Sequence, residues 1–239
     1  MNKSTIFLLL ILIIVSCTKN KEVRIDKSEF QNKTFSIHSK SEQDSLFIEF
    51  QDSTYQTFGD LWQGKIPWKI FNYEKTNFLV LNNKVIGIKK LNKHSFECEY
   101  IGINEKSFEM TERNPKWSKE QIYGTWIEEK YFETNSTDFP PPPVEPDNGN
   151  WNWPPSYTID QDKIQIDFYN QNVSDIEINN SNEFIEMELN NMIGLGIREN
   201  FWRIKYLSDS IMIIDKKVDD FIITNGEKKY NNIKLIKKR

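Results

Sequence analysis

The feature that most constrains the fold is a long succession of short segments in which apolar and polar residues alternate. From residue 32 onward, segments such as "SLFIEF", "KVIGIKK" and "SFECEY" are rich in β-branched and aromatic residues and are separated by Asn, Asp, Gly or Lys. A period of two is typical of strands with one buried face, and close, regular spacing is typical of all-β barrels or sandwiches. We therefore expect an all-β fold of small antiparallel barrels or sandwiches.

The strand segments fall into two sets, divided by "NPKWSKE" at residues 114–120. We expect a first β unit over 31–113 and a second over 114–239. The sets are weakly similar: Thr34-Phe35 matches Thr125-Trp126, and Trp68-Lys69-Ile70 matches Trp202-Arg203-Ile204. Such similarity indicates a tandem duplication, although a codon bias toward Asn, Lys and Ile would produce part of it.

The N-terminus carries a second clear pattern. Every residue from Ile6 to Val15 is apolar, behind a short start that contains Lys3. A membrane-spanning helix needs about 20 such residues, so this run is too short to span. It fits a secretory signal peptide over 1–16, followed by a polar tether over 17–30.

The end of this run, Ile14-Val15-Ser16-Cys17, resembles the lipobox of bacterial lipoproteins. The resemblance implies cleavage before Cys17 and attachment of diacylglyceryl and palmitate-type acyl chains there, which would hold the protein on a membrane. Thr18 resembles the pattern that sorts lipoproteins to the outer membrane. The sequence does not indicate whether the protein would lie on the periplasmic or the outer face of that membrane. The alternative is an ordinary secreted protein with a buried or disulfide-bonded Cys17. Asp44-Ser45-Leu46 resembles the O-glycosylation sequence of the Bacteroidota.

Gly124-Thr125-Trp126 resembles the Gly-x-Trp that opens the first strand of lipocalins and lipocalin-like domains. The resemblance implies an eight-stranded barrel, a tight entry at Gly124 and an end closed by Trp126. It also implies an open mouth for an apolar or amphipathic ligand. The first unit has Lys33-Thr34-Phe35 at the matching place, and Arg239 is a positional counterpart of the arginine that packs on the family's tryptophan.

The segment 139–157, "FPPPPVEPDNGNWNWPPSY", contains seven of the 9 prolines. It falls between the first two strands of the second unit, where lipocalins carry a mouth-covering loop. We expect it either to form a rim for a ligand, a glycan or a protein partner, or to fold onto its own barrel with its indoles buried. The predicted binding residues are Trp151, Trp153, Tyr157, Trp68 and Trp202.

The sequence contains little that could carry catalysis. Its 2 histidines, His38 and His94, have no Cys or Asp at metal-ligand spacing, and no phosphate loop or dinucleotide motif is present. Paired carboxylates such as Glu97 and Glu99 alternate with apolar residues and predict solvent-exposed faces, and Cys98 lies in phase with the apolar ones. We expect no catalytic residues, no metal and no cofactor.

Charge limits the partners. The chain has 31 basic and 35 acidic residues, a formal net charge of −4, which argues against a nucleic-acid partner. We expect a non-catalytic, lipid-anchored binding protein of a bacterial envelope that holds an apolar or amphipathic ligand or a glycan. The alternative is a module with filled barrels that binds another envelope protein. An open apolar interior favours the first, and a filled interior with an exposed aromatic patch favours the second.

Overall fold

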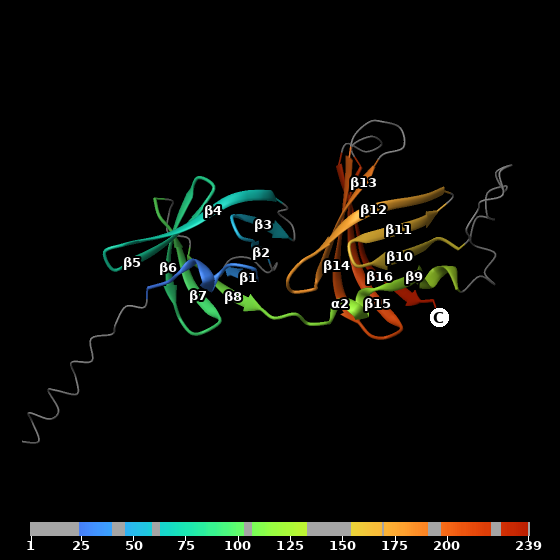
Figure 1. The fold of residues 1–239 in the computed structure, drawn as a ribbon, viewed down its shortest axis with the longest axis horizontal. Helices are drawn as coiled ribbons and strands as arrows, with labels where there is room; N and C mark the ends of the chain where they lie inside the picture. The colour runs from blue at the N-terminus through green and yellow to red at the C-terminus, as the bar shows by residue number, and fades with distance from the viewer. Residues whose placement is uncertain are drawn as a thin grey trace, which may run out of the picture.

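The computed structural model describes residues 24–39, 46–58, 63–102, 107–132, 154–168, 170–190, 197–220 and 226–238. These residues form two closed eight-stranded antiparallel barrels in tandem, shown side by side in Figure 1. The prediction of an all-β fold is confirmed. No helix in the described ranges is long and apolar enough to cross a membrane.

The first barrel closes in chain order, because the last strand, β8, pairs antiparallel with the first, β1. A short 3-10 helix, η1, precedes it at Lys27–Glu29. Its strands are β1 (Lys33–Ser39), β2 (Leu46–Phe50), β3 (Thr54–Phe58), β4 (Gln63–Tyr73), β5 (Thr76–Leu81), β6 (Lys84–Lys90), β7 (Ser95–Tyr100) and β8 (Ser107–Arg113).

The second barrel follows a four-residue helix, α2 (Lys119–Ile122), and closes where β16 pairs with β9. A 3-10 helix, η2 (Glu129–Tyr131), follows its first strand. Its strands are β9 (Gly124–Glu128), β10 (Ser156–Asp160), β11 (Lys163–Phe168), β12 (Asn170–Ile178), β13 (Phe184–Asn190), β14 (Ile197–Leu207), β15 (Ile211–Asp220) and β16 (Gly226–Lys237).

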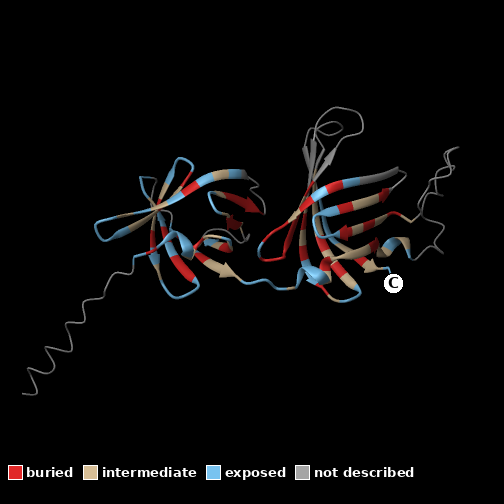
Figure 2. Ribbon diagram, in the orientation of Figure 1, coloured by how far each residue is buried: buried red, intermediate tan, exposed pale blue. Residues whose placement is uncertain are grey.

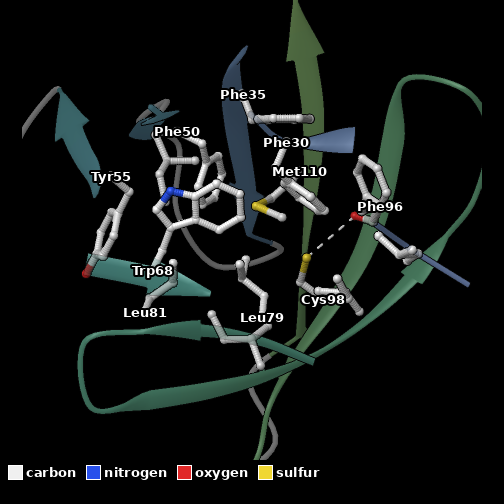
Figure 3. Close-up of a cluster of buried hydrophobic side chains, with 14 of the residues drawn as sticks. Phe30, Phe35, Phe50, Tyr55, Trp68, Leu79, Leu81, Phe96, Cys98 and Met110 are labelled. Atoms are coloured by element: carbon white, nitrogen blue, oxygen red, sulfur yellow. Dashed lines mark hydrogen bonds between the residues drawn. The ribbon is translucent and has the colours of Figure 1, made fainter. Parts of the chain in front are cut away.

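Aromatic rings fill the interior of the first barrel (Figure 3). The ring of Phe30, which follows η1, enters from one end and lies 4.6 Å from Phe96 and 5.2 Å from Phe50, centroid to centroid. Phe50 in turn meets Trp68 at 4.8 Å. An eight-stranded barrel is just wide enough for side chains to fill it, and these rings do so. Cys98 belongs to this core and is fully buried, as its alternation predicts.

The closed end of the second barrel is built around Trp126, which is fully buried. Its indole N–H donates to the carbonyl oxygen of Ile122 at 2.8 Å, so α2 is tied to the core. The ammonium of Lys237 lies 5.0 Å above the ring. Gly124 has φ of +128°, and a Cβ there would lie 2.5 Å from Cε of Lys237. The glycine is therefore required by its backbone conformation, and a larger residue would also displace the end of the lysine side chain that covers the tryptophan.

The two barrels pack against each other through the outer face of β2 and β3. Phe47 and Phe58 point away from the first core but are buried, because Phe184 of β13 packs on them. The centroid of the Phe184 ring lies 4.9 Å from that of Phe47 and 5.0 Å from that of Phe58, the latter stacked. Figure 2 shows β3 and the β12–β13 turn buried where the barrels meet.

Polar contacts surround this aromatic cluster. Arg113 at the end of β8 donates twice to the carboxylate of Glu183, at 2.8 and 3.3 Å. Glu177 of β12 accepts hydrogen bonds from Gln51 and Lys65 of the first barrel, each at 2.7 Å. Bidentate and charge-assisted bonds of this kind fix orientation as well as adding energy, so the β12–β13 turn holds the barrels in a defined arrangement.

Glu49 lies at the centre of the interface and is 2% exposed. Its carboxylate accepts the hydroxyl of Thr34 and the backbone N–H of Asn180 of the second barrel, both at 2.8 Å. Burial raises the pKa of Glu49 above its ordinary value of 4.5, and nearby Glu177 raises it further, although the two hydrogen bonds oppose the shift. The ionised form is therefore disfavoured in the packed protein.

This shift predicts a pH dependence. Because the pKa of Glu49 is higher in the folded protein than in the unfolded chain, its contribution to stability is present at low pH. That contribution is lost as pH rises from about 4.5 through the raised pKa. In Glu49→Gln, whose amide cannot ionise, we expect this part of the pH dependence to disappear when urea unfolding is measured between pH 4.5 and 8. The exposed Glu97→Gln is the matched control, and a Glu49→Gln protein that keeps the wild-type pH profile would contradict the assignment.

Candidate functional site

Strand directions define a mouth in the second barrel. Trp126, the β12–β13 turn and the β14–β15 turn lie toward one end of the barrel, which we call the closed end. The opposite strand ends, such as Glu128 of β9 and Ser156 of β10, lie toward the other end, which we call the mouth. The predicted mouth-covering segment joins these two residues. Of this segment, 139–157, residues 139–153 lie outside the described residues, and so do 133–138, 191–196 and 221–225.

A polar layer lies between the closed-end core and the mouth. Trp202 of β14 is fully buried and lies directly opposite Lys216 of β15, so both side chains face the barrel interior. Tyr157 of β10 reaches across the barrel, and its ring meets that of Trp202 edge to face at 4.9 Å. The ammonium of Lys216 lies 5.6 Å from the centroid of the Tyr157 ring. Three strands thus bring a cation, an indole and a phenol together.

The carboxylate in this layer already has partners. Glu128 accepts the phenol O–H of Tyr157 at 3.2 Å and forms an ion pair with Lys130. Burial raises the pKa of Tyr157, and the negative charge of Glu128 raises it further, so the phenol stays protonated. With Glu128 balanced by Lys130, the charge of Lys216 is left over. The ammonium form of Lys216 therefore has no carboxylate of its own in the layer.

Two buried groups of the layer lack a polar partner. The indole N–H of Trp202 is buried and has no acceptor among the described residues. Lys216 makes a cation–π contact but no ion pair with any described carboxylate. Burial lowers the pKa of Lys216, although Glu128 partly opposes the shift. Leaving a buried donor unpaired costs about 1–3 kcal/mol, so both groups would gain from an anionic acceptor between them.

The structure brings together some of the predicted binding residues. Tyr157 and Trp202 are in contact at this layer, whereas Trp68 lies in the filled core of the first barrel and donates its indole N–H to the carbonyl oxygen of Gln51 at 3.0 Å. Trp151 and Trp153 lie outside the described residues, as does the predicted lipidation site Cys17. Lys216 and Glu128, which also belong to this layer, were not among the binding residues predicted from the sequence.

Nothing in the sequence around Lys216 indicates a binding residue. It lies in "DKKVDD", a run typical of a solvent-exposed turn, and its inward orientation follows from its pairing with Trp202. The two sequence motifs that contain Trp68 and Trp202 also occupy different places, the fourth strand of the first barrel and the sixth of the second. Alignment of these two motifs therefore does not identify equivalent positions. Thr34-Phe35 and Thr125-Trp126 do open the first strand of each barrel.

The first barrel has an outer hollow of different character. Its lining includes His38, Glu97 and Glu109. The ring Nε2 of His38 lies 3.0 Å from the hydroxyl of Ser36, but that serine is 2% exposed, so its hydroxyl is shielded from a substrate. His94 lies 3.0 Å from Glu112 on the same barrel. No group of three or more metal-ligating side chains lies close enough to hold an ion in the described parts of the chain.

The fold and the polar layer define a class: an all-β protein of two closed eight-stranded barrels with buried aromatic clusters. No family model matches the chain, and no curated protein sequence matches it.

The unpaired cation predicts a stability effect. Replacing Lys216 by methionine keeps the length of the side chain but removes a buried ammonium that lacks a carboxylate. We expect Lys216→Met to raise the free energy of unfolding of the ligand-free protein by about 1 kcal/mol at pH 7, measured by urea denaturation. Lys217→Met, next on the strand and facing the other side, is the control. A Lys216→Met protein that is less stable than wild type would contradict the placement of an unpaired ammonium in the interior.

Proposed function

We propose that this chain is a lipid-anchored, non-catalytic binding protein of a bacterial cell envelope, and that its second, lipocalin-like barrel holds an organic anion with an apolar body. The observation that carries the proposal is the buried, unpaired indole N–H of Trp202 beside Lys216. A carboxylate or phosphate between them would accept the N–H and balance the ammonium. Its contact would also restore the charged form of Lys216.

The surroundings favour an amphipathic ligand over a small inorganic anion. Below the layer, the closed-end core is apolar and filled, with Ile204, Ile214 and Leu235 buried beneath Trp202 and Tyr157. Ile166 lies on the inner face of the barrel, partly buried against the same cluster. A ligand with its acidic group at Lys216 would direct its apolar part toward the mouth and the Pro- and Trp-rich segment, as the resemblance to lipocalins implies.

The first barrel has a different part in this proposal. Its interior is filled by Phe30, Phe50, Trp68 and Phe96, so we assign it no internal ligand. The filled interior supports a structural role, and it agrees with the alternative of an interaction module for this half of the chain. The two barrels would then have different roles: the second would bind a small molecule, and the first would present an outer surface for interaction.

Calorimetric titration tests the ligand chemistry. We expect the mature chain with Cys17→Ser to bind dodecanoate and to bind dodecanol and acetate at least tenfold more weakly, because these lack the charge and the apolar body. Lys216→Met and Trp202→Phe should each weaken dodecanoate binding by about 10- to 100-fold, the size of a lost charge-assisted hydrogen bond. Lys217→Met is the control. Equal binding of dodecanoate and dodecanol would contradict the assignment.

Metabolic labelling tests the anchor. If Cys17 is acylated, labelled palmitate should enter the full-length chain expressed in a bacterium and should be absent from Cys17→Ser. The label should stay when Cys98→Ser is made instead, since Cys98 is buried in the first core. Label that persists in Cys17→Ser would contradict lipidation at this residue.

A further inference from the structure

The outer face of β4, β5 and β6 carries a continuous apolar strip. Phe71 of β4 stacks on Phe78 of β5, with ring centroids 4.9 Å apart and an interplanar angle of 17°. Phe78 pairs across the strands with Gly87 of β6, and a Cβ at Gly87 would lie 3.5 Å from Cδ1 of Ile101. Tyr73 continues the strip toward the β4–β5 turn, on the same face of β4 as Phe71.

These side chains are open to solvent. Phe71 is 41% exposed, Tyr73 65% and Ile101 50%. Single exposed apolar residues are common, but adjoining aromatic rings on one sheet face indicate an interaction surface. Lys69 and Lys75 flank the strip and are exposed, and so are two acidic residues, Glu74 in the β4–β5 turn and Glu99, which pairs with Gly87. An aromatic strip bordered by lysines matches the water–lipid interface, where tyrosine and phenylalanine enter the head-group region and lysines meet anionic lipids.

The strip lies on the side of the first barrel turned away from the second barrel. The interface is formed by β2 and β3. In the order of the closed barrel, β4 neighbours β3, and β6 lies four strands from β2, on the opposite side. Figure 1 shows the β4–β5 turn and the start of the described chain at the end of the molecule farthest from the second barrel. The second barrel would therefore not obstruct a flat surface brought against the strip.

The N-terminal chain joins the barrel beside the strip. The backbone N–H of Ile25 donates to the side chain of Asn77 at 3.0 Å, and Asn77 is the immediate neighbour of Phe78 on β5. Only seven residue steps separate Cys17 from Arg24. A fully extended chain spans at most about 3.3–3.6 Å per residue, so acyl chains on Cys17 would keep Arg24 within about 25 Å of the bilayer surface.

We propose that the strip of Phe71, Tyr73, Phe78 and Ile101 lies on the bilayer surface in the lipid-anchored protein. This inference rests on the proposed acylation of Cys17. The short tether brings the face to the head groups, and burial of the exposed rings then adds to the binding energy of the acyl chains. The second barrel is held on the far side of the first, with its mouth available to ligand.

Thiol accessibility on vesicles tests the contact. Tyr73→Cys is made in the acylated chain, where Cys17 is blocked and Cys98 is buried. The chain is bound to vesicles of phosphatidylethanolamine and phosphatidylglycerol and treated with a water-soluble maleimide. We expect residue 73 to react at least tenfold more slowly than in the same variant carrying Cys17→Ser free in solution. Tyr206→Cys, at a tyrosine of the second barrel that is 50% exposed, is the matched control and should react equally in both.

The outcomes separate the two proposals. An acylated chain that fails to sediment with vesicles overturns the anchor and with it the docking. A chain that sediments but reacts at residue 73 at the solution rate overturns the docking and leaves the anchor in place. Adding Phe71→Ser to Tyr73→Cys should restore the reaction rate at least threefold, and a rate that stays low despite this loss of apolar surface also overturns the docking.

Discussion

The width of an eight-stranded barrel governs the rest of this structure. Such a barrel leaves room for side chains and little else, so its function depends on which side chains point inward. In the first barrel they are aromatic and apolar, and Phe30 completes the filling from outside the strands. In the second, the same constraint places Tyr157 against Trp202 at mid-height. Charged groups lie beside this contact, and Lys216 has no ion pair with a described carboxylate.

At the junction between the barrels, both faces of β2 are buried, one in the core of the first barrel and one against the second barrel. In β2, Ile48 and Phe50 fill the first core, while the outward residues Phe47 and Glu49 are buried by the other barrel. Phe184 supplies the apolar contact and Asn180 the hydrogen bond to Glu49. The β12–β13 turn thereby fixes the orientation of the second barrel relative to the first. That orientation also determines which way the mouth and the exposed face of β4–β6 point.

Much of the fold could be predicted from the sequence because strand alternation is local. The strict alternation in "SFECEY" places Cys98 inside and Glu97 outside, as the structure shows. Gly124 and Trp126 also lie in the first strand of a closed barrel, and Lys237 covers the tryptophan, while Arg239 lies outside the described residues. These features depend on neighbours in the chain.

The binding layer could be predicted only in part, because it depends on contacts between distant strands. Tyr157 and Trp202 were selected as aromatic residues, but their meeting across the barrel follows from closure. Lys216 appears in a charged run, and its inward direction follows from its cross-strand pairing with Trp202. The burial of Phe47 and Glu49 depends on the second barrel, which no pattern within β2 reveals.

The central claim is that Trp202 and Lys216 together receive an anion, and the most direct measurement is the indole N–H resonance of Trp202. It would be assigned in a ¹⁵N–¹H spectrum by its loss in Trp202→Phe and followed during titration with dodecanoate. A new hydrogen bond to a carboxylate should move the proton resonance downfield by several tenths of a part per million, and Lys216→Met should abolish the shift at the same ligand concentration. A resonance that stays in place while dodecanoate binds elsewhere would contradict the account.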